Sequence, residues 1–191
     1  MLKKVKDLVY KKILKKISLW DTFSKYYIST KRYIDFVILN KNLPLPSSIQ
    51  VEITTKCNCK CIACSRGTLN PSRLNKDMSL DEFKKIISQI HSLKWVQLSG
   101  LGEPLFHKNL KDILVYAVSK GIYLTTNTNG TTLNEDNIDL ILKYFHTIVF
   151  SFDSVYKENF ERIRSGANYD SVCRNIRELV KKRKKWHLAL K

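Results

Sequence analysis

Four cysteines lie within eight residues of this sequence, and three of them have a spacing that suits an iron–sulfur cluster. Cys57, Cys61 and Cys64 follow the pattern C-x3-C-x2-C. A short loop of this kind can place three thiolates around one corner of a [4Fe–4S] cube, which needs four ligands. The fourth iron is then open to a small molecule, so the cluster can act as a reagent.

Two other interpretations of the cysteines remain open at this point. Cys57, Cys59, Cys61 and Cys64 could together form a tetrahedral zinc site, although single-residue spacings are unusual for zinc. A disulfide framework is disfavoured, because the sequence shows no signal peptide and clustered cysteines then indicate metal or redox chemistry. Cys59 is not a ligand in the iron–sulfur interpretation, and Cys173 is expected to be a small buried side chain on a helix.

The composition indicates one globular core and an anionic partner. The chain has 191 residues, of which 43% are hydrophobic, and a formal net charge of +17. Such an excess of positive charge favours nucleic acid, a membrane surface or an acidic substrate as partner. A lysine-rich solvated surface is the alternative. No run of about 18 uncharged apolar residues occurs, so no transmembrane helix is predicted.

Residues 2–17 are predicted to form a basic amphipathic helix. Apolar residues recur with helical spacing, and lysines fill the other face and interrupt every apolar run. This interruption argues against a signal peptide. The helix would either lie on anionic lipid or RNA or pack on the domain with its lysine face in solvent.

A domain boundary is predicted after a second helix over residues 21–39. Pro44 and Pro46 end the helical pattern that precedes them. We therefore expect residues 1–45 to be a basic helical extension. Residues 46–191 are expected to be the catalytic domain.

The remainder of the chain alternates between strand and helix patterns. Strands are predicted over 49–54, 95–99, 122–126 and 147–152, and a fifth is expected to open at 187–190. Helices are predicted from a capping box at Ser79 and Glu82 onward, and over 109–119, 134–144, 154–163 and 171–183. This alternation predicts an α/β fold, a partial TIM-like barrel of parallel strands with right-handed crossovers.

Residues that could bind a ligand or take part in a reaction lie at the ends of the predicted strands. The cysteines follow the first strand, residues 100–103 the second and residues 127–130 the third, and Asp153 ends the fourth. In parallel βα folds, function gathers at the carboxyl ends of the strands. The sequence therefore predicts a cluster-binding site at the mouth of the sheet.

Two of these strand ends carry glycine-rich segments. In Gly-Leu-Gly-Glu-Pro, Gly100 and Gly102 allow close backbone approach to a ligand, and Glu103 offers a carboxylate to a cation. A simple turn is the alternative. The segment 126–130 reads Thr-Asn-Thr-Asn-Gly, which a tight turn explains equally well.

Taken together, these motifs resemble the radical SAM enzymes (SAM is S-adenosylmethionine). The resemblance covers residues 49–191 and includes the cysteine spacing, the Gly-Leu-Gly-Glu-Pro loop, the Thr-Asn-Gly turn and a Ser-Phe-Asp-Ser segment at 151–154. It implies a [4Fe–4S] cluster whose open iron binds the amino and carboxylate groups of SAM. The reduced cluster cleaves SAM in that family, and the resulting 5′-deoxyadenosyl radical abstracts hydrogen from a substrate.

The resemblance also implies roles for individual residues. Cys57, Cys61 and Cys64 would bind the cluster, and Glu103 would bind the amino group of SAM. Arg164 is expected to form a structural salt bridge. The residues that would contact SAM are Ala63, Gly100, Gly102, Glu103, Asn127, Ser151 and Asp153.

The sequence departs from the family pattern in two respects. The residue before the third cysteine is usually bulky in that family, whereas here it is Ala63, which removes a packing surface near the adenine. The family core has six strand–helix units, whereas this chain stops as a fifth strand begins. We therefore expect an incomplete barrel, as in a fragment, an interrupted gene or one half of a split enzyme.

The resemblance favours a peptide or protein substrate. The Gly-Leu-Gly-Glu-Pro loop is similar to that of the SPASM or peptide-maturase-like branch of the family. Sugar- or tRNA-modifying radical SAM enzymes, and a basic zinc protein that binds RNA, are the alternatives. Expected partners are SAM, a reductant such as flavodoxin or ferredoxin, and an anionic surface of membrane or RNA. A cytoplasmic location is expected, with or without peripheral membrane contact.

Overall fold

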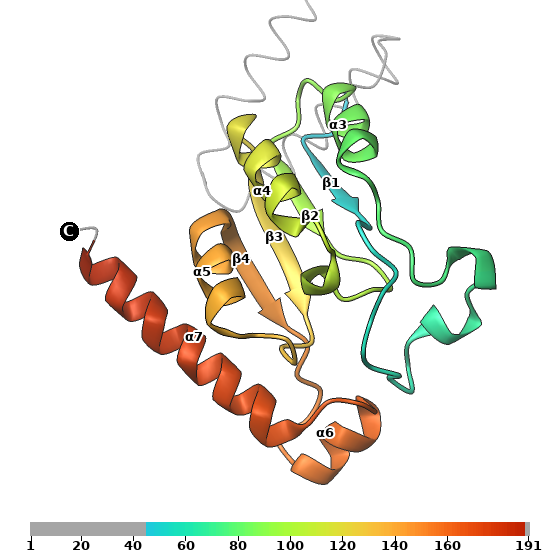
Figure 1. Cartoon of the computed structure of the whole chain (residues 1–191), viewed down its shortest axis with the longest axis vertical. Coiled ribbons are helices and arrows are strands. Elements are labelled where there is room, and N and C mark those ends of the chain that lie inside the picture. The colour runs from blue at the N-terminus through green and yellow to red at the C-terminus, as the bar shows by residue number, and fades with distance from the viewer. Residues whose placement is uncertain (1–44, 190–191) are drawn as a thin grey trace, which may run out of the picture. The chain divides into compact units, whose positions relative to one another are not determined.

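Alternating apolar and polar residues predict four strands, and the computed structural model contains all four in one parallel sheet (Figure 1). The strands lie in chain order, as βα units with sequential crossovers require. The predicted α/β fold is thereby confirmed. The strands are β1 (Ser48–Val51), β2 (Trp95–Leu98), β3 (Tyr123–Thr128) and β4 (Phe145–Phe150).

The structure describes residues 45–189, which belong to one compact unit. The helices predicted over 2–17 and 21–39 lie outside the described residues. The division into an extension, residues 1–45, and a core, residues 46–191, stays a prediction.

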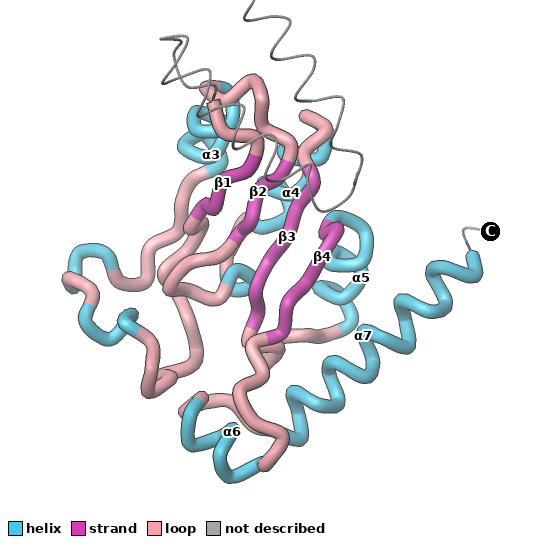
Figure 2. The backbone as a smooth tube through the Cα atoms, turned by 180° about the vertical axis from the view of Figure 1, so that it is seen from behind, coloured by secondary structure: helices cyan, strands magenta, loops and turns pink. Residues whose placement is uncertain are grey.

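Three helices connect the strands and cover one face of the sheet (Figure 1). Figure 2, seen from behind, shows that none of the described helices covers the opposite face. This open face is the concave side of a partial barrel. The connecting helices are α3 (Leu80–Ser88), α4 (Leu110–Ser119) and α5 (Glu135–Tyr144), and three 3-10 helices lie in loops: η1 (Ser65–Thr68), η2 (Pro71–Arg73) and η3 (Pro104–Phe106).

Local signals set the ends of the helices. The Ser79 hydroxyl accepts a hydrogen bond from the Glu82 N–H, and the Glu82 carboxylate accepts one from the Ser79 N–H. The predicted capping box is therefore confirmed. Gly121 follows α4 with a φ of 70°, the left-handed conformation that ends many helices and favours glycine.

The core lies between the sheet and its covering helices. The strands contribute every second residue to it, including Val96, Leu98 and Leu124, whose side chains are fully buried. From the helices, Phe83 and Ile113 pack against them, and Phe83 is likewise fully buried. This layer fixes the strands, and thereby the positions of the loops that follow them.

The prediction of a fifth strand at 187–190 was wrong for residues 187–189, which the structure places in a helix. The chain continues from α6 (Lys157–Ile163) into one long helix, α7 (Tyr169–Ala189). The sequence from 171 to 189 has neither proline nor glycine, and His187-Leu188-Ala189 lacks the β-branched residues that favour a strand. None of the helices in the described part of the chain combines the length and hydrophobicity needed to cross a membrane.

The loop after β2 packs tightly on the segment after β1. A Cβ atom at Gly102 would collide with the Thr54 carbonyl and lie 2.9 Å from the Lys56 carbonyl oxygen. Because these are backbone atoms, they cannot rotate away. Gly102 is therefore required for the close approach of the two loops.

Replacing Phe83 with alanine should lower the free energy of unfolding by about 3–5 kcal/mol, since a buried aromatic side chain leaves a cavity. Urea denaturation followed by circular dichroism measures this loss. Tyr156→Ala is the control, because Tyr156 is 71% exposed, and it should change stability by no more than about 0.5 kcal/mol. Equal effects of the two variants would contradict the assigned core.

Gly102→Ala should lower the free energy of unfolding by about 1–3 kcal/mol, since one loop must shift to accommodate the methyl group. Gly67→Ala is the matched control, because a Cβ atom there meets nothing within 4 Å. The stabilities of the two variants are compared by their midpoints of urea denaturation. A Gly102→Ala protein as stable as Gly67→Ala would disprove the tight packing of these loops.

Candidate functional site

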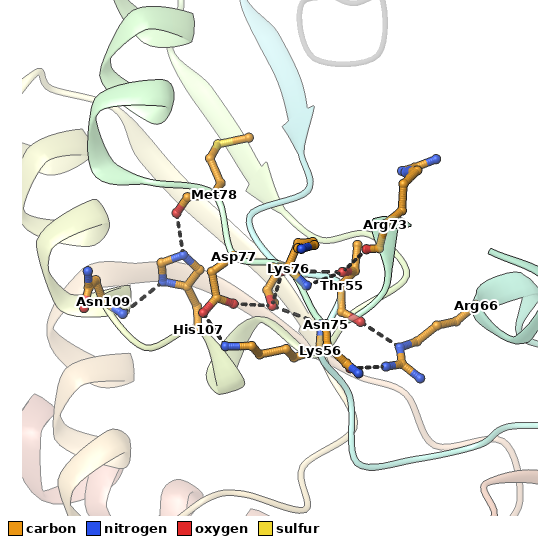
Figure 3. Close-up of polar contacts among 11 residues, drawn as sticks. Thr55, Lys56, Arg66, Arg73, Asn75, Lys76, Asp77, Met78, His107 and Asn109 are labelled. Carbon is orange, nitrogen blue, oxygen red and sulfur yellow. Dashed lines mark hydrogen bonds and ion pairs between the residues drawn. The ribbon is translucent and has the colours of Figure 1, made fainter. Parts of the chain in front are cut away.

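The segment after β1 is fixed in place before the first cysteine is reached (Figure 3). We call residues 54–66 the cysteine loop. The Thr54 hydroxyl donates to Asp77 Oδ1 at 2.7 Å, and the Thr55 N–H donates to the Lys76 carbonyl at 2.9 Å. These bonds tie the start of the loop to the segment that precedes α3.

Arg66 ties the end of the cysteine loop to its beginning (Figure 3). Its Nε–H donates to the Thr55 carbonyl at 2.7 Å, and its Nη2 donates to Asn75 Oδ1 at 2.7 Å. The four cysteines therefore lie in a loop whose two ends are joined.

The middle of the cysteine loop pairs with the junction between α6 and α7. The Lys60 N–H donates to the Ser165 carbonyl at 2.7 Å, and the Ile62 N–H donates to the Ile163 carbonyl at 3.0 Å. Two backbone bonds thus attach the loop to a segment about a hundred residues further along the chain. The loop is held on both sides by backbone contacts.

The cysteines divide into two groups by burial. Cys57 and Cys61 are half-buried and Cys64 is exposed, whereas Cys59 is 4% exposed and packs in a small core with α6 and α7. Among residues 45–189, no three His, Cys, Asp or Glu side chains lie close enough to hold a single metal ion. Burial thus sets Cys59 apart from the three predicted cluster ligands.

The sulfurs of the three predicted cluster ligands all accept N–H hydrogen bonds. The donors are Cys59 N for Cys57 at 3.4 Å, Arg66 N for Cys64 at 3.5 Å and Arg164 Nη1 for Cys61 at 3.7 Å. Soft thiolates with N–H donors around them suit an iron–sulfur cluster. The residues present therefore fit the group that the sequence predicts.

The environment of Cys57 favours its thiolate. The Cys59 side chain donates a hydrogen bond that lowers the pKa of the Cys57 thiol to about 6, against the opposing effect of burial. The same bond raises the pKa of Cys59, as does its burial. Burial also raises the pKa of Cys61, which the nearby Arg164 guanidinium counteracts. The pKa values of Cys57 and Cys59 are thus shifted in opposite directions, downward for Cys57 and upward for Cys59.

The Gly-Leu-Gly-Glu-Pro loop lies against the segment after β1. The Leu101 N–H donates to Glu52 Oε1 at 2.7 Å, and the Glu103 N–H donates to the Lys56 carbonyl at 2.7 Å. Gly100 lies against the Glu52 side chain, where a Cβ atom would collide with it. The predicted loop is therefore next to the cysteine loop, in contact with the residue before Cys57.

An open cavity of about 470 Å³ lies beside this loop. Its lining residues come from β1, from the residue just after β1 and from the segment that follows β2. They are Gln50, Glu52, Ser99, Gly100 and Leu101.

The carboxylate of Glu103 is buried and joins β2 to the end of β3. It is 3% exposed, and its oxygens accept hydrogen bonds from the Thr128 hydroxyl at 2.8 Å and the Asn129 N–H at 2.6 Å. The Leu105 N–H is a third donor, at 3.3 Å. Burial raises the pKa of Glu103, and these hydrogen bonds oppose that effect.

The two asparagines at the end of β3, Asn127 within the strand and Asn129 just after it, occupy different places. Asn127, the predicted SAM contact, is exposed, and its Oδ1 accepts a 3.4 Å hydrogen bond from Gln97. Asn129 is buried and donates to the cysteine loop, with Nδ2 3.8 Å from Cys57 Sγ. The sequence placed Asn129 in the predicted Thr-Asn-Gly turn, but the SAM contact was assigned to Asn127 and the contact of Asn129 with the cysteine loop was not predicted.

The two residues predicted at the end of β4 contact neighbouring segments of the chain. The Ser151 N–H donates to the Thr128 carbonyl at 2.9 Å, so it is joined to the end of β3. Asp153 forms an ion pair with Arg164 at 2.6 Å, as predicted for this arginine. Ala63 is exposed on the cysteine loop. The SAM contacts assigned to these residues stay predictions.

Comparison with known proteins identifies relatives along most of the chain. The model of the Radical SAM superfamily matches residues 51–189. The antilisterial bacteriocin subtilosin biosynthesis protein AlbA of Bacillus subtilis is 27% identical over 85% of this chain and 35% of AlbA. A probable GTP 3′,8-cyclase of Methanococcus maripaludis is 29% identical over 70% of this chain and 45% of that protein.

Solved structures share the fold. Streptococcus suis SuiB bound to S-adenosylmethionine has a TM-score of 0.63 at 15% identity, covering 94% of this chain and 42% of SuiB. A second structure of SuiB, with its precursor peptide SuiA, has a TM-score of 0.58 at 15% identity, covering 93% of this chain and 42% of SuiB. The chain spans less than half the length of these relatives. The family model nonetheless matches well over half of the chain, from β1 into α7, so this chain belongs to the radical SAM superfamily.

Proposed function

We propose that this chain carries the cluster-binding and SAM-binding part of a radical SAM enzyme. The supporting observation is the arrangement of the cysteine loop at the carboxyl ends of the parallel strands. Cys57 and Cys61 are half-buried and Cys64 is exposed there, whereas Cys59 is buried in the core. Three available thiolates match a [4Fe–4S] cluster with one iron left open.

Each part of the loop has a task in this proposal. Cys57, Cys61 and Cys64 hold the cluster, and the backbone bonds of Lys60 and Ile62 to the α6–α7 junction fix the path between them. When bound, the reduced cluster would supply the electron for reductive cleavage of SAM to methionine and a 5′-deoxyadenosyl radical. The residues of the chain bind and orient the reactants around it.

The surroundings of Glu103 allow one further hydrogen-bond donor. An ionised carboxylate offers about four acceptor sites, and Thr128, Leu105 and Asn129 use three of them. One site is left for an ammonium group. We therefore assign Glu103 to the amino group of SAM, with Gly100 and Gly102 holding the loop close to the cysteines.

We propose a peptide or protein as the substrate. The name of AlbA assigns it to bacteriocin biosynthesis, and SuiB was solved with a precursor peptide. The cavity of about 470 Å³ beside Gly100 offers polar groups of Gln50, Glu52 and Ser99 to such a substrate. A small-molecule substrate is the alternative, because one relative is a probable GTP 3′,8-cyclase. SAM cleavage stimulated by GTP and not by a precursor peptide would count against the peptide assignment.

Further partners are also proposals. We propose that a reductant such as flavodoxin or ferredoxin supplies the electron and that the chain acts in the cytoplasm. The basic residues exposed along one side of α7 would contact an anionic membrane surface or RNA. They are Arg174, Arg177, Lys181 and Lys184. Binding to RNA or anionic vesicles that persists undiminished at high salt would argue against this contact.

Replacing Cys57, Cys61 or Cys64 with alanine should remove the cluster, since a cube held by three thiolates loses one corner ligand. After anaerobic reconstitution with iron and sulfide, the unchanged chain should hold about four irons, and each variant far fewer. With dithionite and SAM, only the unchanged chain should form 5′-deoxyadenosine.

Cys59→Ala is the control that separates iron–sulfur from zinc binding. Its thiol is buried in the core, so the variant should still bind about four irons. Cys173→Ala, on α7, should do the same. Loss of metal from Cys59→Ala, or zinc in place of iron in the unchanged chain, would refute the assignment.

A further inference from the structure

Asn129, in the turn after β3, contacts both the cysteine loop and the Gly-Leu-Gly-Glu-Pro loop. Its side chain is buried, and its Oδ1 accepts hydrogen bonds from the Thr131 N–H at 2.9 Å and the Thr131 hydroxyl at 2.7 Å. Two bonds to one oxygen fix the orientation of the amide plane. The Nδ2 group must therefore point in the opposite direction, toward the cysteine loop.

The amide nitrogen of this side chain contacts the cysteine loop at three atoms. Nδ2 lies 3.0 Å from Asn58 Oδ1, 3.4 Å from Cys59 Sγ and 3.8 Å from Cys57 Sγ. Nδ2 carries two hydrogens. One is donated to Asn58 Oδ1, and the other is shared between Cys59 Sγ, which is nearer, and Cys57 Sγ. Asn129 is thus a donor to sulfur that comes from outside the loop itself.

The backbone of the same residue contacts the carboxylate assigned to SAM. The Asn129 N–H donates to Glu103 Oε2 at 2.6 Å. A single residue therefore joins the Gly-Leu-Gly-Glu-Pro loop to the sulfur of Cys57. Any displacement of the turn after β3 moves both contacts together.

We propose that Asn129 is a positioning residue that holds the Cys57 sulfur through its Nδ2–H and thereby helps to set the reduction potential of the bound cluster. This inference rests on the proposed function. Hydrogen bonds to the sulfurs are among the factors that set the potential of iron–sulfur clusters. A donor stabilises the more negative, reduced state, so its removal makes the cluster harder to reduce.

The test is a redox titration of the reconstituted chain without SAM, followed by the electron paramagnetic resonance signal of the reduced cluster. Asn129→Ala removes the donor. Asn129→Asp keeps the size and the oxygen that Thr131 requires, but replaces the donor with a carboxylate oxygen. Both should lower the equilibrium constant for reduction about tenfold, on the order of 59 mV more negative for one electron.

Asn175→Ala is the matched control. Asn175 Nδ2 donates to the Gly130 carbonyl at 3.0 Å, so it supports the same turn from α7 without contacting sulfur. This variant should keep the potential of the unchanged chain. If Asn129 merely stabilised the turn, the reduction potential of the Asn175→Ala variant would shift as well.

Iron content separates this inference from the proposed function. An unchanged chain that takes up no iron refutes the proposed function itself. A fully loaded Asn129→Asp chain whose potential equals that of the unchanged chain overturns only the role of Asn129. If folded Asn129 variants fail to load iron whereas Asn175→Ala loads fully, the positioning of Cys57 is supported directly.

Discussion

The buried carboxylate of Glu103 is the interaction on which the arrangement of the site depends. A carboxylate removed from water is costly unless hydrogen bonds compensate it, and here the donors come from the end of β3. The loops after β2 and β3 must therefore stay together. Gly102 lets this pair approach the carbonyls of Thr54 and Lys56, so the cysteine loop joins the same rigid group.

The parts of this structure that follow local rules could be predicted from sequence. Strand periodicity and the capping box at Ser79 depend on neighbouring residues, and both have the predicted form. The order of strands then follows from the short connections between them. Once the sheet was parallel, the gathering of the cysteines and Glu103 at one edge was a geometric necessity.

The parts that depend on distant contacts could not be predicted. The C-x3-C-x2-C spacing sets Cys59 apart as the cysteine that is not a ligand, but its burial is set by α6 and α7, a hundred residues later, and no local pattern predicts it. Asn129 and Asn127 have the same side chain two positions apart, yet β3 ends between them, so they do not share an environment. The prediction of a fifth strand was wrong because a four-residue strand pattern is too short to outweigh the helical pattern of α7.

The pairing of the cysteine loop with residues 163–165 has a consequence for the order of events in the cell. Lys60 and Ile62 obtain their backbone partners only when Ile163 and Ser165 exist. A ribosome that has just made the four cysteines has more than a hundred residues still to add before the loop can close. Loading of metal into a closed loop is therefore a late step, after nearly the whole of the described chain has been synthesised. Until then the thiols of an open loop are exposed to oxidation.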